Sequence, residues 1–165
     1  MVILGIDPGL ANTGWGVIES IGSRHRCLAY GCITTTPSES LPARLASVYA
    51  ELQRVVARYE PVECAIESVY FGSNAKSAFA TGQARGVAIL ALAERGLTLG
   101  EYSPVQIKSA VVGAGSADKS QVAYMMRVLL GLAEEPAPDH AADALAVAVC
   151  HSHLRAARAM HEAAI

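Results

Sequence analysis

The sequence predicts an α/β fold in which a mixed five-stranded sheet is flanked by helices. Three strand-like segments follow one another closely at the start, which is typical of an antiparallel meander. Two later strand-like segments are separated by helical stretches, which favours parallel pairing, and the last third is helical. The chain has 165 residues, 52% of them hydrophobic, which suits one globular domain over residues 1–165.

The first strand is expected at residues 2–7, where Val2, Ile3, Leu4 and Ile6 form an apolar run. Such a run is typical of a strand that is buried on both faces. Pro8 and Gly9 end the strand. The next two strands are expected at 13–20 and 25–34, with a turn around residues 22–23.

Period-2 alternation predicts a fourth strand at 62–67, with Val62, Cys64 and Ile66 on one face. A fifth, short strand is expected at 98–102. Apolar spacing, Pro104 and capping residues predict helices at 40–59, at 74–95, after Pro104, from a Ser116 or Asp118 cap to about 131, and at 139–158 with Asp139 as N-cap.

The composition restricts the partners and the compartment. The net charge is −2, so a nucleic acid would have to bind a local basic patch, and there are only three lysines. The four cysteines contain no C-x-x-C pair, which favours buried thiols in a reduced, cytoplasmic protein over a zinc site. We expect neither a signal peptide nor a membrane span.

Acidic residues collect where the predicted elements end or begin. Asp7 and Glu67 end two strands, while His140 and Asp143 share one face of the last helix. Carboxylates in one cleft raise each other's pKa, and divalent cations remove that cost. Two such cations can promote phosphodiester hydrolysis. The alternative is that each acid is only solvated or favours a helix N-terminus.

Gly5-Ile6-Asp7-Pro8-Gly9 resembles the first strand of two protein families. Actin-like ATPases and sugar kinases use this turn to hold ATP phosphates, and RNase H-like nucleases use the aspartate to hold metal. The chain is too short for the two domains of an actin-like ATPase. The glycines at 9, 14 and 16 would let another backbone or a phosphate approach closely.

Longer motifs resemble the RuvC Holliday-junction resolvases of bacteria along nearly the whole chain. They are Gly5-Ile6-Asp7-Pro8-Gly9, Ala65-Ile66-Glu67, Gly82-Gln83-Ala84-Arg85-Gly86-Val87, the 112–122 string with Gly113, Gly115, Ser116 and Lys119, and Ala141-Ala142-Asp143-Ala144-Leu145-Ala146. The resemblance implies an RNase H-like fold and a homodimer that works beside the RuvA–RuvB branch-migration motor. It also implies paired symmetric, metal-dependent cuts in four-way DNA junctions, leaving 5′-phosphate and 3′-hydroxyl ends.

Asp7, Glu67 and Asp143 match three of the family's four acidic metal ligands, and His140 takes the place of the fourth. The resemblance implies two divalent metal ions, Mg²⁺ or Mn²⁺, per active site. We predict that Mn²⁺ works better, because imidazole suits transition metals better than Mg²⁺. Lys119 is expected to assist catalysis beside the scissile phosphate.

Further residues are expected to bind DNA or the second subunit. The DNA-binding candidates are Tyr70, Phe71, Lys76, Lys108 and Lys119, although the two aromatics could instead pack into the core. Gly82 and Gly86 are expected at the dimer interface, since glycines inside a helix indicate close approach. His151 and His153 are expected at a solvated helix end. Two alternatives remain open: an actin-like ATP-binding protein and a junction-binding module without catalysis.

Overall fold

Five strands form one mixed sheet in the order β3-β2-β1-β4-β5. The computed structural model describes residues 1–68 and 75–162, with side chains to residue 155. Strand β1 pairs antiparallel with β2 and parallel with β4, while β2–β3 is antiparallel and β4–β5 is parallel. The strands are β1 (Val2–Asp7), β2 (Asn12–Ile21), β3 (Arg24–Thr34), β4 (Glu63–Glu67) and β5 (Thr98–Tyr102). The predicted meander followed by parallel strands is confirmed.

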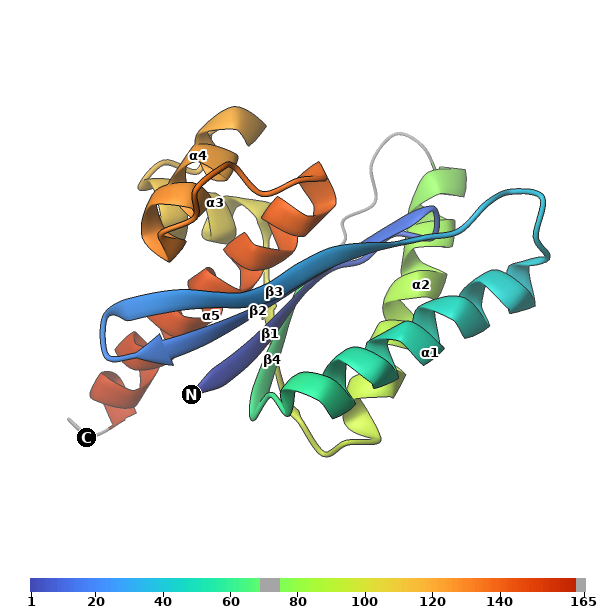
Figure 1. Ribbon diagram of the computed structural model, residues 1–165, viewed down its shortest axis with the longest axis horizontal. Coiled ribbons are helices and arrows are strands. Elements are labelled where there is room, and N and C mark those ends of the chain that lie inside the picture. Colours follow the sequence, from blue (N-terminus) through green and yellow to red (C-terminus); the bar gives the residue numbers. More distant parts are fainter. Residues whose placement is uncertain (69–74, 163–165) are drawn as a thin grey trace.

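Helices cover both faces of this sheet (Figure 1). Helices α1 (Leu41–Tyr59) and α2 (Ala75–Ala93) pack on one face, and α3 (Pro104–Val112), α4 (Lys119–Leu130) and α5 (Asp139–Glu162) cover the other. Each face has its own apolar cluster, with Leu52 and Leu92 in one and Met126 and Leu145 in the other. In the described ranges no helix combines the length and hydropathy that crossing a membrane requires.

Local sequence sets where the helices begin. Asp118 is the N-cap of α4, because its side chain accepts a hydrogen bond from the backbone N–H of Gln121 in a capping box. This decides between the two predicted caps. The prediction that Asp139 caps the last helix is wrong, because Asp139 is already the first residue of α5. The backbone N–H of Ala141 donates to the carbonyl of Pro138 at 2.9 Å.

Strand β4 differs from the predicted one-sided strand. Val62 lies before the strand and its side chain is 57% exposed, whereas Cys64, Ala65 and Ile66 are all buried. The reason is that β4 lies between β1 and β5 with helices on both faces, so neighbouring residues point into two different cores.

Helix α5 lies unusually close to β1 and β2 because glycines face it. A Cβ atom at Gly14 would overlap the backbone carbonyl of His140, and one at Gly5 would overlap that of Ala144. At Gly16 it would lie 2.7 Å from the Leu145 side chain. The expectation that glycines here admit another backbone is confirmed for Gly14 and Gly16, which admit α5, whereas Gly9 lies against the carbonyl of the nearby Asn12.

Candidate active site

The site forms where β1, β4 and α5 meet. Asp7 ends β1 and Glu67 ends β4, and parallel pairing brings these strand ends side by side. His140 and Asp143 project from the start of α5, which the glycines hold against β1 and β2. The four side chains open into one cleft of about 290 Å³, whose lining comprises Asp7, Glu67, Pro104, Ile107, Lys108, Lys119, Val122, His140 and Asp143.

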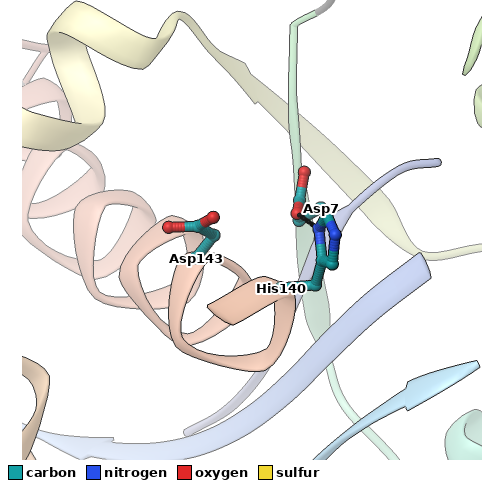
Figure 2. A group of neighbouring side chains, drawn as sticks. All are labelled: Asp7, His140 and Asp143. Carbon is teal, nitrogen blue, oxygen red and sulfur yellow. Dashed lines mark hydrogen bonds and ion pairs between the residues drawn. The ribbon is translucent and has the colours of Figure 1, made fainter. Parts of the chain in front are cut away.

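Three of these side chains can offer ligand atoms to a single cation. Atoms of Asp7, His140 and Asp143 lie within 4.8 Å of one another. The imidazole of His140 points from α5 toward Asp7, and its Nδ1 lies 2.7 Å from Asp7 Oδ2 (Figure 2). Two carboxylates and an imidazole form a donor set that suits Mn²⁺ well and Mg²⁺ less well.

The electrostatics of the cleft also favour a cation. Burial raises the pKa of Glu67 to about 8, and the charge of Asp7, a hydrogen bond with Asp7 and the charge of Asp143 act in the same direction. Burial and then the charge of Asp7 likewise raise the pKa of Asp143. These acids therefore carry their full negative charge near neutral pH only at a cost that a bound divalent cation would remove.

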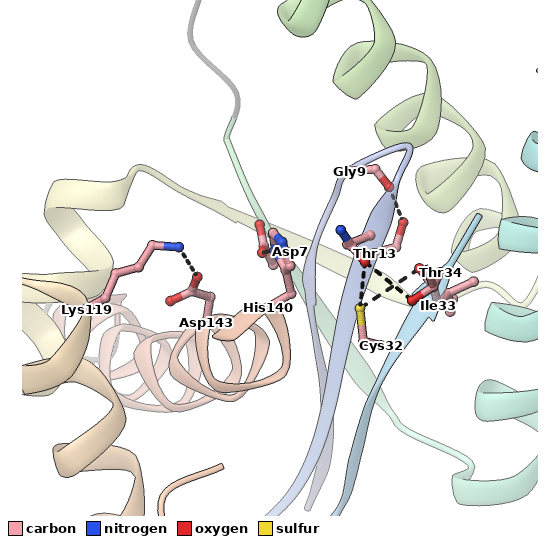
Figure 3. A network of polar contacts seen from close by, with 10 residues as sticks. Asp7, Gly9, Thr13, Cys32, Ile33, Thr34, Lys119, His140 and Asp143 are labelled. Carbon is pink, nitrogen blue, oxygen red and sulfur yellow. Dashed lines mark hydrogen bonds and ion pairs between the residues drawn. The ribbon is translucent and has the colours of Figure 1, made fainter. Parts of the chain in front are cut away.

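Two lysines supply positive charge at the rim. Lys119 is the first residue of α4, and its Nζ lies 3.6 Å from Asp143 Oδ2 (Figure 3). The Lys119 side chain is 66% exposed, so it can move toward a phosphate. Lys108 of α3 lines the same cleft. A phosphodiester that enters the cleft would therefore meet both carboxylates and ammonium groups.

The structure does not bring every predicted site residue to this cleft. Lys76 lies exposed in the first turn of α2 and is not part of the cleft lining. Gly82 and Gly86 lie on the outer side of α2, where an added Cβ would meet nothing within 4 Å in the described part of the chain other than the nearby backbone of α2. Tyr70 and Phe71 fall outside the described residues.

Sequence reasoning missed a second hollow that His140 also lines. This hollow measures about 300 Å³, and its polar lining includes Asn12, Arg44, Ser77 and Thr81. Arg44 donates from Nε to Thr35 Oγ1 at 2.8 Å. These residues come from four separate stretches of the chain and share no motif, so only the fold brings them together.

Comparison with known proteins decides the class. A family model described as "Crossover junction endodeoxyribonuclease RuvC" matches residues 3–151. The chain belongs to the RuvC family. The crossover junction endodeoxyribonuclease RuvC of Alkaliphilus oremlandii (strain OhILAs) is 50% identical over 153 residues, covering 93% of each chain. That of Pelotomaculum thermopropionicum is 48% identical over the same share of each chain.

Solved structures of RuvC proteins agree with this assignment. Thermus thermophilus RuvC superposes with a TM-score of 0.88 at 37% identity, covering 96% of this chain and 97% of that one. The same protein in complex with a Holliday junction substrate gives a TM-score of 0.89 at 36% identity, with 94% of each chain covered. The family resemblance and the predicted fold class are thus confirmed, and the choice between nuclease and actin-like ATPase falls to the nuclease.

Proposed function

We propose that this protein is a structure-selective endonuclease that resolves four-way (Holliday) DNA junctions in recombination and repair. It would cut two opposed strands symmetrically and leave 5′-phosphate and 3′-hydroxyl ends. One observation carries the proposal: the cleft of a RuvC-family chain gathers three carboxylates, one imidazole and two lysines. Relatives of this chain are named crossover junction endodeoxyribonucleases.

We infer that Asp7, Glu67, His140 and Asp143 hold divalent metal, two ions per active site. Support comes from the clustered ligand atoms and from the raised pKa of Glu67 and Asp143. Bound divalent cations would supply Lewis acidity for hydrolysis of the phosphodiester. His140 would orient Asp7 through the 2.7 Å contact, and we expect its imidazole to favour Mn²⁺ over Mg²⁺.

We infer that the lysines face the DNA backbone. Lys119 would neutralise the scissile phosphate beside Asp143, and Lys108 would contact the same strand from α3. Tyr70 and Phe71 would stack on bases near the crossover, and Lys76 would bind a phosphate at the start of α2. Since the net charge is −2, these local contacts would account for the DNA affinity.

We also propose a homodimer that uses the outer face of α2. Phe79 and Leu90 are 67% and 53% exposed, and they lie on one stripe with the exposed Gly82 and Gly86. Exposed apolar side chains around glycines suit close packing against a second copy of the helix. A twofold dimer would present two equal active sites to the two equivalent strands of a junction.

The remaining partners are inferred from the family alone. We expect the RuvA–RuvB branch-migration complex to work with this protein, as the resemblance implies. We also propose that the protein works in the cytoplasm, where the DNA of a bacterial cell lies.

An end-labelled four-way junction tests the function directly. The protein is incubated with the junction and, separately, with a linear duplex of the same sequence, in Mn²⁺ or Mg²⁺. We expect paired symmetric nicks that DNA ligase can reseal, in the junction only. Asp7→Asn should reduce cleavage at least about 100-fold and leave junction binding intact. Junction binding without cleavage by the unmodified protein would favour the non-catalytic module instead.

A further inference from the structure

Three consecutive residues of α5 each hydrogen-bond to a different strand, far along the helix from the active site. His151 Nε2 lies 2.8 Å from Glu63 Oε2 of β4. Ser152 Oγ lies 2.8 Å from Ser20 Oγ of β2, and His153 Nε2 lies 3.0 Å from His25 Nε2 of β3. The expectation of a solvated helix end is therefore wrong for His151, which is 5% exposed, and the neighbouring Ser152 is only 9% exposed.

The partners of His151 exclude a simple metal-ligand role for it. Its second ring nitrogen, Nδ1, lies 2.9 Å from the hydroxyl of Tyr102, so both nitrogens are engaged. Arg155 donates from Nε to the other carboxylate oxygen of Glu63 at 2.6 Å. Burial opposes ionisation of Glu63, but the hydrogen bonds from His151 and Arg155 hold its pKa below its usual range. The bridge is thus a charged, partly buried carboxylate with two side-chain donors.

This bridge and the active site join the same two elements. Glu63 and Glu67 are the two ends of β4 and lie on one face of it, about 13 Å apart at about 3.3 Å per residue. His151 and Asp143 are eight residues apart on α5, about 12 Å at 1.5 Å per residue. The two spans match, so α5 runs antiparallel to β4 with a polar contact at each end.

Between these ends α5 packs through small residues on β1, the strand beside β4, where Gly5 faces Ala144 and Ala148. Such apolar packing is non-directional, so it fixes the position of α5 along the sheet less sharply than a hydrogen bond does. A buried hydrogen bond has a narrow range of distance and angle. Gly100 leaves room for the imidazole ring of His151, because a Cβ at Gly100 would lie 2.5 Å from His151 Nδ1.

We propose that His151 is a positioning residue: its bond to Glu63 fixes the register of α5 on β4, and thereby holds Asp143 opposite Glu67 for metal binding. This inference rests on the proposed metal-dependent function. Loss of this bond should lower the metal affinity directly and should slow cleavage only through the weaker metal binding. The proposal assigns a purpose to a buried histidine that touches neither metal nor DNA.

Two amide substitutions separate the two bonds of His151. In His151→Gln the side-chain amide can reach the place of Nε2 and keep the bond to Glu63. In His151→Asn the shorter amide takes the place of Nδ1, keeps the bond to Tyr102 and loses Glu63. We expect His151→Asn to weaken Mn²⁺ binding about tenfold or more and His151→Gln to stay within about threefold of the original protein. Isothermal titration with Mn²⁺ measures both.

A stability-matched control separates positioning from general loosening. Val55→Ala removes buried methyl groups from α1 on the opposite face of the sheet, and should lower stability with unchanged Mn²⁺ affinity. If His151→Asn does not fold, Glu63→Gln is titrated with Mn²⁺ instead. This variant loses the negative charge that holds His151 and Arg155, so it should also bind Mn²⁺ more weakly. Unchanged affinity in the bridge variant, or an equal loss in His151→Gln and His151→Asn, would overturn the proposal.

Cleavage of a labelled junction provides the second readout. We expect a higher Mn²⁺ concentration for half-maximal cleavage in His151→Asn, with a similar rate at saturating metal. If the original protein binds Mn²⁺ but does not cut junctions, the proposed function fails, whereas the titration still decides the role of His151.

Discussion

Glu63 and Glu67 show how environment gives two identical side chains opposite properties. Both lie at the ends of β4 and face α5. Glu63 has donors from His151 and Arg155, and its pKa is lowered. Glu67 is buried beside Asp7 and Asp143, and its pKa is raised to about 8. The carboxylate of Glu63 is therefore satisfied by its own hydrogen-bond donors. The carboxylate of Glu67 lies among other acids, and a bound metal would supply the positive charge that it needs.

This contrast predicts opposite effects of removing each charge in metal-free protein. The unfolded chain ionises Glu67 near its ordinary pKa of 4.5, whereas the folded protein keeps that proton to about pH 8. Stability is therefore lost as the pH rises through this window. In EDTA at pH 8, Glu67→Gln should raise the free energy of unfolding by about 1–2 kcal/mol, and Glu63→Gln should lower it.

Urea denaturation at pH 5 and pH 8 measures both changes. The benefit of Glu67→Gln should shrink at pH 5, because most of the stability loss accumulates between pH 5 and pH 8, where the unfolded chain has released the proton that the folded protein keeps. Added Mn²⁺ should stabilise the original protein and have little effect on Glu67→Gln. A Glu67→Gln protein that is no more stable than the original in EDTA at pH 8 would contradict the charge conflict described above.

His140 predicts the metal preference. With an imidazole in place of a fourth carboxylate, cleavage should be several-fold faster in Mn²⁺ than in Mg²⁺ at equal concentration. His140→Asp should narrow that gap, because it restores a set of oxygen ligands that suits Mg²⁺. Single-turnover cleavage rates in the two metals measure the ratio. Equal rates in both metals that persist in His140→Ala would show that the imidazole is not a ligand.

Around helix α5, some site residues can be predicted from local sequence patterns, whereas the contacts between distant parts of the chain cannot. Asp7, Glu67 and Asp143 could be chosen from the sequence because each stands at the end or start of a strong pattern. The glycines of β1 and β2 could be predicted to admit a backbone, but their partner could not, because it lies more than 120 residues away along the chain. A separation of 88 residues likewise hid the bond between His151 and Glu63.

Gly14→Ala tests the close approach of α5. The added methyl group would overlap the His140 carbonyl, so α5 must move away from β2 and carry His140 and Asp143 with it. We expect a loss of about 1–3 kcal/mol in stability and roughly a 100-fold loss of cleavage, because misplacement by about 1 Å is enough for that. Val48→Ala, buried on the opposite sheet face, is the control. Similar cleavage by both variants well below their melting temperatures would refute the idea.

The arrangement of the sheet follows from patterns that are strong over many residues, so the meander, the parallel strands and the amphipathic α1 could be predicted. The error at β4 has a physical cause. A five-residue strand carries too few side chains to distinguish one buried face from two, and the helices that bury its second face come from other parts of the chain. A sequence pattern likewise cannot show which apolar residues of a helix stay exposed in the folded chain.

The exposed stripe of α2, formed by Phe79, Gly82, Gly86 and Leu90, bears on whether two copies of the chain form a dimer. Apart from the nearby backbone of α2 itself, no atom of the described residues lies within 4 Å of where a Cβ of Gly86 would be, although a helix glycine costs about 1 kcal/mol relative to alanine. The space and the exposed Phe79 and Leu90 are explained together if a second α2 packs there. Gly86→Leu would then separate the two helices and give monomers, which sedimentation velocity at micromolar concentration would detect.

Ala57→Leu provides the matched control, because it adds a leucine to an exposed position of α1 away from the stripe and should leave a dimer. The Gly86→Leu monomer should melt at a temperature close to that of the original protein. It should still bind Mn²⁺, since all the residues that line the cleft come from one chain. It should lose the paired, symmetric character of junction cleavage, because two coupled cuts need two sites held by one twofold axis. An original protein that sediments as a monomer, or a Gly86→Leu protein that remains a dimer, would place the interface elsewhere or remove it.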